Sequence, residues 1–554
     1  MTGFLDINVS SFDALPGNSL DEEVGTTFNY QDNLIVSRGR HTFKFGIDMR
    51  RIRLNNSGNA IDSGTVSFSS LPNFVKDTVN TLTLNAAEGI HGLRRLFTMA
   101  YAQDEWKVTR QLTLSLGLRY EYYGVAHEVL DRAVVVDIPG CGGICPHGTQ
   151  WYAPSPYDFG PRVGVAWAPS AFHGKTVFRS GFGLFYGANQ NDDFSDPMES
   201  TAARYSVSVA DIPTLSYPIT PFLGQLGTLG LSPKTIDRHR KDLYNENWNF
   251  TVQQLLPHNF LLQVGYVGSE GHHLFDRTYV NLLNPVTRVR PAPQFNQLLF
   301  KENQGNSTFN ALQATLQRPF KHGFLWQTNY MWSHAIADAS VGAGEQVFFE
   351  NQGCRSCDRS DTNLGARQTI TMNSIYQLPF GHGRPFLSQG GMLSAVVGNW
   401  NLSGRSTART GRPLNITISR AATVMLDGVT NNQRPDYVYG QSIYAAHQTI
   451  TQWFNAAAFA TPARFAWGDL GREIARGPAF YEIDAGLERQ GRISEKVRVS
   501  FRAELFNLLN HPIYANPNTS FSAANFGRIS SILNTGTNGT GTPRRTQLMV
   551  RVEF

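Results

Sequence analysis

The last ten residues, RTQLMVRVEF from Arg545 to Phe554, have the pattern that best indicates the fold. Apolar and mostly polar side chains alternate along them, which is the period of a β-strand with one apolar face. The apolar face carries Leu548, Val550, Val552 and Phe554. A strand of a soluble sandwich would alternate in the same way. The stretch therefore predicts a half-buried strand and leaves the kind of sheet open.

The composition narrows the protein to two classes. Of the 554 residues, 41% are hydrophobic and 12% aromatic, but only 16% are charged, against about a quarter in an average soluble domain. No run approaches the ~20 consecutive apolar residues of a membrane-spanning helix. A large soluble all-β protein and a transmembrane β-barrel both fit, because a barrel spreads its lipid-facing residues over every second position.

The charge and the amino-terminal residues exclude some alternatives. The net charge of +5 is small for this length and no basic run is present, so nucleic-acid binding has no support. The first residues, MTGFLDINVSSF, lack the basic start and apolar core of a signal peptide. An outer-membrane protein needs such a peptide. Either the barrel interpretation is wrong, or the chain lacks its natural front end.

The clearest strand covers residues 111–122, where leucines at alternate positions lead to Tyr120 and Tyr122. Aromatic residues at the end of an apolar face are typical of a membrane interface. Similar patterns predict fourteen further strands: Val24–Ser37, Thr42–Leu54, Phe97–Val108, Phe159–Ala168, Thr176–Gly187, Tyr244–Leu256, Phe260–Gly268, Thr308–Gln317, Phe324–His334, Ala366–Leu378, Asn399–Thr410, Ala479–Glu488, Val497–Leu508 and Arg545–Phe554.

The predicted connections alternate between short and long. Outer-membrane barrels place short turns in the periplasm and long loops outside, whereas sandwiches vary their loops at both ends. Counting back from Phe554 puts every short turn on the periplasmic side. The fifteen strands form an odd number, and Val24–Ser37 would run from outside to periplasm. We therefore expect an all-β fold, a large antiparallel transmembrane outer-membrane β-barrel that is incomplete at its amino-terminal side.

A series of short motifs, each weak alone, occurs in the order of one family. The chain resembles, over nearly its whole length, the barrel portion of the Oar-like TonB-dependent receptors of Acidobacteria and related phyla. The motifs are HTFKFGIDMRR (His41–Arg51), YAQDEWKVTRQLTLSLGLRYEYY (Tyr101–Tyr123), FGPRVGVAWAP (Phe159–Pro169), GKTVFRSGFGLFYG (Gly174–Gly187), NWNFTVQQLLPHNFLLQVGYVGSEGHHL (Asn247–Leu274), FNALQATLQRPFKHGF (Phe309–Phe324), YMWSHAIADA (Tyr330–Ala339), QLPFGHGRPF (Gln377–Phe386), GRPLNIT (Gly411–Thr417) and FRAELFNLLNHPIY (Phe501–Tyr514).

The resemblance implies a barrel of about 22 strands, with a periplasmic plug, a TonB-contacting segment and often an amino-terminal β-sandwich. Residues 1–554 would then be one partial barrel domain, with about 15 of the strands and without those other parts. The closing strand, with Leu548, Val550, Val552 and Phe554, would be the insertion signal read by the barrel-assembly machinery. In a complete receptor it would pair with the first strand. Since that strand is missing here, the closing edge should be left open or mispaired.

Four cysteines form two close pairs, Cys141 with Cys145 (CGGIC) and Cys354 with Cys357 (CRSC). Both pairs lie in Gly-rich or polar stretches, which favours two short loop disulfides in an oxidising compartment. Free thiols are an alternative. A four-cysteine zinc site is another, although two distant loops would have to meet and the first pair has the wrong internal spacing for a zinc knuckle.

The other candidate residues favour structural roles. His272 and His273 are neighbours on a predicted strand, so they should point to opposite faces and not share a metal. Asp192, Asp193, Asp196 and Glu199 suggest a solvated acidic loop, with a calcium site as the alternative. Gly268–Gly271 (GSEG) is predicted to be a turn. Arg498, Arg502 and Glu504 should face the lumen and pair, or contact a plug. We find no catalytic constellation and expect no enzyme activity, metal or cofactor.

Two functions remain. The first is membrane transport: the barrel of a TonB-dependent receptor in the outer membrane of a Gram-negative-type bacterium, importing or exporting a large solute. Its expected partners are outer-membrane lipid, the barrel-assembly machinery and, through a plug, the TonB complex. The second is an outer-membrane surface or adhesion protein without transport, or a non-functional fragment. The plug discriminates between them, and the sequence does not indicate the solute.

Overall fold

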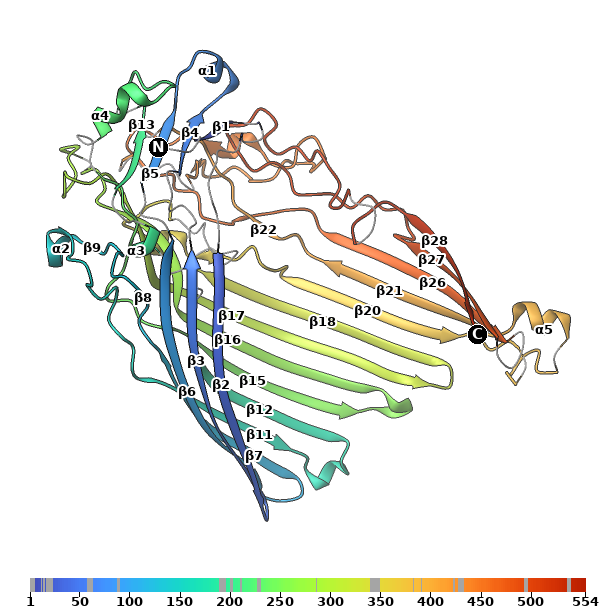
Figure 1. Ribbon diagram of the computed structural model, residues 1–554. Coiled ribbons are helices and arrows are strands. Elements are labelled where there is room, and N and C mark those ends of the chain that lie inside the picture. Colours follow the sequence, from blue (N-terminus) through green and yellow to red (C-terminus); the bar gives the residue numbers. More distant parts are fainter. Residues whose placement is uncertain are drawn as a thin grey trace.

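The computed structural model describes residues 5–554 except 11, 13–14, 16–22, 57–62, 87–89, 189–195, 200–202, 210–211, 227–230, 285, 339–348, 382, 390, 422–423, 427–432, 493–496 and 536–539 (Figure 1). Strands make up about 52% of the residues and helices about 8%. The all-β prediction is therefore confirmed. None of the helices in this described part is long and apolar enough to cross a membrane.

One sheet of 18 strands forms the body of the molecule, and three of its members, β8, β14 and β19, have only two residues each. The other fifteen follow each other in chain order, each hydrogen-bonded to the next in antiparallel orientation. They are β2 (Glu23–Arg38), β3 (His41–Asn56), β6 (His91–Lys107), β7 (Leu112–Tyr123), β11 (Asp158–Trp167), β12 (Thr176–Gly187), β15 (Leu243–Leu255), β16 (Leu261–Val280), β17 (Leu298–Lys321), β18 (Phe324–Ala337), β20 (Gln368–Gln377), β21 (Trp400–Arg409), β26 (Phe480–Arg492), β27 (Arg498–Phe506) and β28 (Arg545–Glu553).

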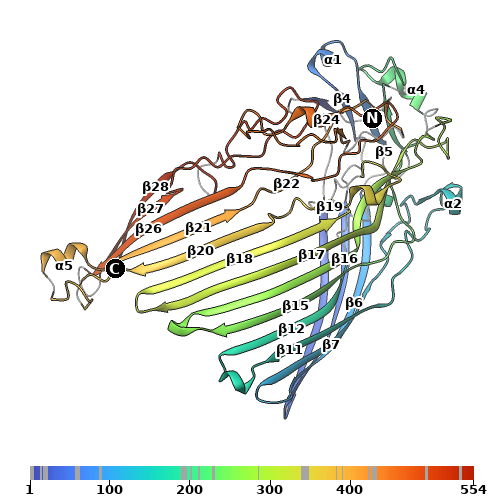
Figure 2. The same cartoon turned by 180° about the vertical axis from the view of Figure 1, so that it is seen from behind.

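The sheet curves so that β2 and β28 form its two edges (Figures 1 and 2). In the described pairings β2 is bonded to β3 alone and β28 to β27 alone. Within the described residues, β28 therefore has a paired strand on one edge only.

The two faces of the sheet differ in chemistry. The register places Leu116, Val163 and Phe182 side by side on the convex face, and Tyr266, Leu312 and Trp332 continue the same face. All six side chains are exposed. Exposed apolar side chains in this density suit contact with lipid hydrocarbon. Polar and charged residues occupy the alternate positions on the concave face.

Aromatic side chains gather near both ends of the convex face. Next to the short connections, the rings of His41 and Trp106 stack 5.4 Å apart, and those of Trp400 and Phe501 meet edge to face at 6.2 Å. At the opposite end the ring centroids of Tyr120 and Phe159 lie 5.0 Å apart. Aromatic side chains at both ends of an apolar face are typical of the interface girdles of a membrane barrel.

The alternation of short and long connections is confirmed for most of the described connections, but not for residues 378–399 between β20 and β21, which are more than a short turn. Short turns join β2 to β3, β6 to β7, β11 to β12, β15 to β16 and β17 to β18, at the end of the sheet where the carboxy-terminus lies (Figure 1). The long connections gather at the other end. They contain the two-residue strands β8 (His127–Glu128), β9 (Val136–Asp137), β10 (Gly143–Ile144), β14 (Thr235–Ile236), β19 (Ser360–Asp361), β22 (Pro413–Leu414), β23 (Asp436–Tyr437), β24 (Phe459–Ala460) and β25 (Ala475–Arg476).

Helices are few and short. They are α1 (Leu71–Val75), α2 (Ile138–Cys141), α3 (Asp196–Glu199), α4 (Leu223–Leu226) and α5 (Met392–Val397), with 3-10 turns η1 (Ser170–Phe172), η3 (Thr220–Phe222), η4 (Pro257–Asn259), η5 (Arg355–Asp358) and η7 (Ala456–Ala458). Of these, α5 lies in the connection between β20 and β21, at the short-turn end (Figure 1).

Some predicted boundaries were wrong. Gly268–Gly271 is not a turn but lies inside β16, which runs on to Val280 and pairs there with the first half of β17. A bulge between Gly271 and Leu274 breaks the alternation at this point, so the continuing strand could not be recognised from period two. The predicted polar loop before Leu93 contains β4 (Ser63–Phe68), α1 and β5 (Thr81–Ala86), and β6 begins six residues before the predicted start.

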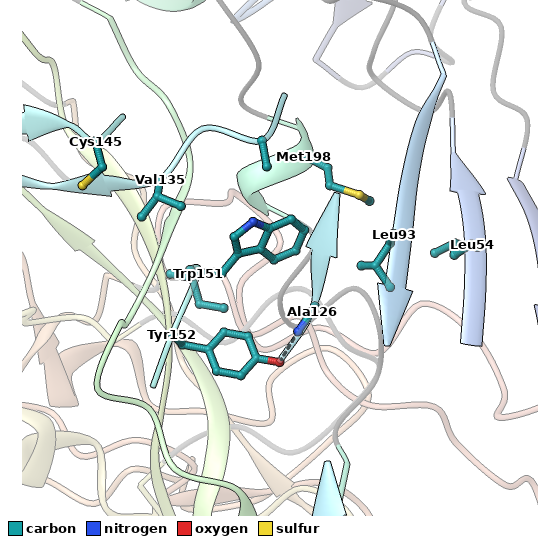
Figure 3. Close-up of a cluster of buried hydrophobic side chains, with 10 residues drawn as sticks. Leu54, Leu93, Ala126, Val135, Cys145, Trp151, Tyr152 and Met198 are labelled. Atoms are coloured by element: carbon teal, nitrogen blue, oxygen red, sulfur yellow. Dashed lines mark hydrogen bonds between the residues drawn. The ribbon is translucent and has the colours of Figure 1, made fainter. Parts of the chain in front are cut away.

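The long connections carry their own hydrophobic cores. Strands β1 (Asp6–Val9), β4, β5 and β13 (Ala203–Ser208) form a separate four-stranded sheet, whose buried side chains include Val66, Leu82 and Val207. A second cluster surrounds Phe454 and Leu470 in residues 411–479. A third joins the outer ends of β3 and β6 to residues 125–152 (Figure 3), where the Ala126 N–H donates to the Tyr152 hydroxyl at 3.1 Å.

Candidate functional site

The concave face carries ion pairs within single strands. Side chains two residues apart point the same way on a strand, and four such pairs have nitrogen–oxygen distances of 2.5–2.9 Å: Asp48 with Arg50, Arg119 with Glu121, Arg502 with Glu504, and Arg551 with Glu553. The predicted pairing of Arg502 and Glu504 is therefore present. Each pair places one positive and one negative side chain on the concave face, so the pairs add polar groups to this face without adding net charge.

At the long-connection end, Arg355 lies among three carboxylates. Its guanidinium contacts Asp276 on β16, lies 3.2 Å from Asp338 and 3.8 Å from Glu302 on β17. Asp276 and Glu302 stand on the parts of β16 and β17 that extend beyond β15, and all three carboxylates are buried. One cation thus joins three adjoining segments of the wall.

A second buried cluster centres on Arg434. Its guanidinium lies 2.7 Å from Glu350 and 2.5 Å from Asp358, and its Nε donates to the Leu470 carbonyl at 2.8 Å. Burial, partly offset by Arg434, raises the pKa of Glu350 to about 7. The nearby charge of Asp358 adds to the effect of burial and favours the protonated form of Glu350. The cluster fastens the segment before β19 to the connection between β21 and β26.

The Cys354–Cys357 pair lies between these two clusters. The structure joins the cysteines by a disulfide, with Cα atoms 5.4 Å apart, and Arg355 and Asp358 belong to the same turn, η5. The turn therefore reaches one cluster with Arg355 and the other with Asp358. Cys141 and Cys145 are likewise joined, with Cα atoms 5.2 Å apart.

A zinc site does not fit the two cysteine pairs. Within the described residues, the one group of three or more close ligand types is Asp137, Cys141 and Cys145, which takes both sulfurs from one pair. In a disulfide these sulfurs are not thiolates, the form that binds zinc.

The remaining candidates have structural surroundings. The rings of His272 and His273 both lie against Tyr244, at 4.8 and 5.7 Å, because the bulge disturbs the strand alternation; the expectation of opposite faces was wrong. Asp196 is not solvated but fully buried, 2.9 Å from buried Lys301. Asp192 and Asp193 lie outside the described residues, as does the side chain of Glu199. On the closing strand Leu548, Val550, Val552 and Phe554 are exposed.

A cavity of about 470 Å³ lies at the outer ends of β17 and β18. Phe309, Met331 and Leu364 contribute to a largely apolar wall, and charged residues gather around Asp361 at one side. The Asp361 carboxylate lies 2.7 Å from His334 and 3.2 Å from Arg367, and also contacts Arg476. Two guanidiniums against one carboxylate leave a positive excess, so the cavity can accommodate a molecule with an apolar body and an anionic group.

A protein-family model described as "Outer membrane beta barrel domain" matches residues 1–547. The chain belongs to this family. The protein is therefore located in the outer membrane. Because the outward face of such barrels is apolar, we expect the convex apolar face to meet lipid. No curated protein matches the chain.

Solved structures share the fold of the barrel domain. The outer membrane transporter YddB from Escherichia coli is similar with a TM-score of 0.55 at 12% identity, covering 99% of this chain and 57% of YddB. Similarity at lower TM-scores is found with the siderophore receptor PirA from Acinetobacter baumannii (TM-score 0.48, 10% identity, 98% of this chain and 55% of PirA) and the pyoverdine outer membrane receptor FpvA from Pseudomonas aeruginosa (0.47, 9%, 96% and 53%). The fold resembles that of the outer membrane transporter YddB, and the chain spans little more than half the length of these three proteins.

Proposed function

We propose that the barrel domain forms part of the wall of a TonB-dependent transporter that imports or exports a large solute. The observation that carries this proposal is the ordered fifteen-strand wall, which matches the transporter YddB over 99% of this chain. The motif series gives independent support from the sequence. A plug inside the barrel would couple the wall to the TonB complex, and the Oar-like subtype belongs to the same proposal.

The end of the sheet that carries the long connections has features suited to binding a solute. The Arg355 and Arg434 clusters hold the long connections in fixed positions above the wall, and the cavity beside Asp361 opens among them. Rigid external loops around an amphipathic cavity would give a solute its first binding surface.

The test compares three strains: one with the gene intact, one with it deleted, and one with the TonB complex inactivated. Untargeted mass spectrometry of spent medium and cells measures which solutes change. We expect at least one large solute to change in the same direction in both mutants and to be restored when the gene is returned. If no solute changes in the same direction in both mutants, the proposal that this protein takes part in TonB-dependent transport is wrong.

A surface-binding role is the second candidate. The four-stranded sheet of β1, β4, β5 and β13 has its own core and stands apart from the main sheet at the external end (Figure 1). An adhesion protein would use such a lobe. Deletion of the gene would then lower cell attachment to surfaces or to neighbouring cells without changing any solute.

A further inference from the structure

The connection between β20 and β21, residues 378–399, differs from the other connections at its end of the sheet. It carries the helix α5, whereas β17 (ending at Lys321) and β18 (beginning at Phe324) are joined by a tight turn. Its backbone closes on itself: the Gly381 N–H donates to the Phe386 carbonyl at 2.9 Å, and the Asn399 N–H donates to the Phe380 carbonyl at 3.2 Å. A Cβ on Gly381 would lie 2.9 Å from the Cα of Gly398, so this close approach requires glycine. The described residues of this connection are therefore held together by their own backbone contacts.

In α5 the apolar side chains are exposed and a polar side chain is buried, which is the opposite of the usual pattern for a helix in water. Its Ser394 is 6% exposed, whereas Met392, Leu393 and Val396 are 87%, 62% and 60% exposed. Apolar side chains turned outward while a serine is buried indicate surroundings that are themselves apolar. Residues 378–399 contain one arginine, one histidine and no carboxylate, so little charge opposes such surroundings.

The end of α5 is joined to the lipid side of the wall. The indole N–H of Trp400 donates to the Val396 carbonyl at 3.1 Å, and Nε of Arg489 donates to the Gly398 carbonyl at 3.2 Å. Trp400 and Arg489 pair across β21 and β26 on the convex face, next to Phe501. The exposed face of α5 is thus continuous with the aromatic band that faces lipid.

We propose that α5 is an interfacial anchor that inserts Met392, Leu393 and Val396 into the periplasmic leaflet of the outer membrane, with phospholipid as its partner. Short apolar helices at a membrane surface bury one face at the boundary between headgroups and acyl chains. The choice of leaflet rests on the periplasmic position of the short connections. The anchor would fix the rim of the wall where β20 and β21 meet the membrane surface.

Met392 is a natural probe for this contact. Isolated outer membranes containing the protein are treated with hydrogen peroxide, and oxidation of each methionine is followed by peptide mass spectrometry. We expect Met392 to react about tenfold more slowly than in the urea-unfolded chain, as Met49 on the convex face of β3 should. Oxidation of Met392 at the unfolded rate would overturn the proposal.

A second measurement identifies what covers the helix. The full chain is reconstituted in bilayers of phospholipid with a photoreactive group in the acyl chain, and labelled peptides are mapped after irradiation. We expect label on residues 386–397, lost in the double variant L393D/V396D and kept in S388D/Q389D, which alters exposed polar positions of the same connection. Protection of Met392 without lipid label would assign the cover to protein and overturn the proposal. If α5 is not labelled by lipid but the long connections are found outside the cell and the short turns in the periplasm, the anchor proposal is wrong and the transport proposal is unaffected.

Discussion

The carboxylate of Glu350 lies 2.7 Å from the guanidinium of Arg434, and both side chains are almost fully buried. A buried ion pair of this kind is costly to break, because removal of one partner leaves the other charge without compensation. Here Asp358 contacts the same guanidinium at 2.5 Å. Loss of Arg434 would therefore leave two buried carboxylates, and the external connections that meet at this point would separate.

Replacement of Arg434 by methionine should destabilise the external lobe around Phe454 by about 3–5 kcal/mol. The strands should stay folded, because they are held by their own hydrogen bonds. Hydrogen exchange of residues 433–479 in the reconstituted protein measures the effect. Arg464→Met is the matched control: Arg464 is exposed in the same connection, and its loss should change exchange little. Equal exchange in both variants would contradict the role given to Arg434.

The same cluster predicts a dependence on pH. The folded-state pKa of Glu350, raised mainly by burial to about 7, exceeds its unfolded value, so the folded state binds the extra proton. The stability from this group is present below about pH 4.5 and is lost as the pH rises through about 7. Hydrogen exchange of residues 433–479, corrected for intrinsic amide rates, should accelerate over this range.

Two comparisons make that pH prediction specific. Glu350→Gln should remove most of the acceleration. Glu128 has the opposite behaviour: burial would raise its pKa, but hydrogen bonds from Arg132, Gly92 and Leu130 outweigh this and lower the pKa to about 2. Residues 127–132 should therefore not open over the same pH range. Faster exchange there as well would point to general loosening of the protein.

The Cys354–Cys357 disulfide should stabilise the turn that joins the two ionic clusters. Closing a loop of this size contributes about 2 kcal/mol in the chain-entropy account. In the double variant C354S/C357S, trypsin should cleave after Arg355 more rapidly, because the turn opens more often. The variant C141S/C145S is the control and should leave this cleavage unchanged. Alkylation of unreduced protein should modify none of the four cysteines; labelled cysteines would contradict the disulfide assignment.

Neighbouring residues on β17 test which face meets lipid. Leu312 lies on the convex face and Gln313 on the concave face. Leu312→Arg should destabilise the barrel by about 2–4 kcal/mol if this position is near the middle of the bilayer, whereas Gln313→Arg should have little effect. Urea unfolding of the protein in phospholipid vesicles measures both. Similar losses for the two variants would mean that the faces are assigned wrongly.

Much of the wall could be predicted because its signal is local. In Thr176–Gly187 most large apolar side chains fall at every second position, among them Phe178, Phe182 and Leu184, and the predicted and observed bounds agree. Prediction failed where a bulge or a tertiary contact replaced the period of two. The bulge at Gly271–Leu274 interrupts the alternation, so the outer half of β16 was not predicted. In residues 63–86 the two strands, β4 and β5, have only six residues each, and alternation over so few residues did not indicate a separate small sheet.

The ionic clusters could not be predicted at all. Asp276, Asp338 and Arg355 are far apart in the sequence and meet only after the long connections fold. The sequence CRSCD, with opposite charges beside a pair of cysteines, was the one local sign that this turn joins charged partners. Asp196 shows the same limit, since its acidic neighbours suggested a solvated loop and only the fold reveals Lys301.

The most direct test of the account is the position of two turns relative to the membrane. Gly440 lies in a long connection and Gly174 in a short turn, and a side chain at either would meet open space. A short epitope inserted after each is probed with antibody on intact cells and again after the outer membrane is permeabilised. The account predicts that the Gly440 epitope is detected on intact cells and the Gly174 epitope only after permeabilisation. Detection of the Gly174 epitope on intact cells, or of neither epitope until permeabilisation, would contradict an outer-membrane barrel with long loops outside.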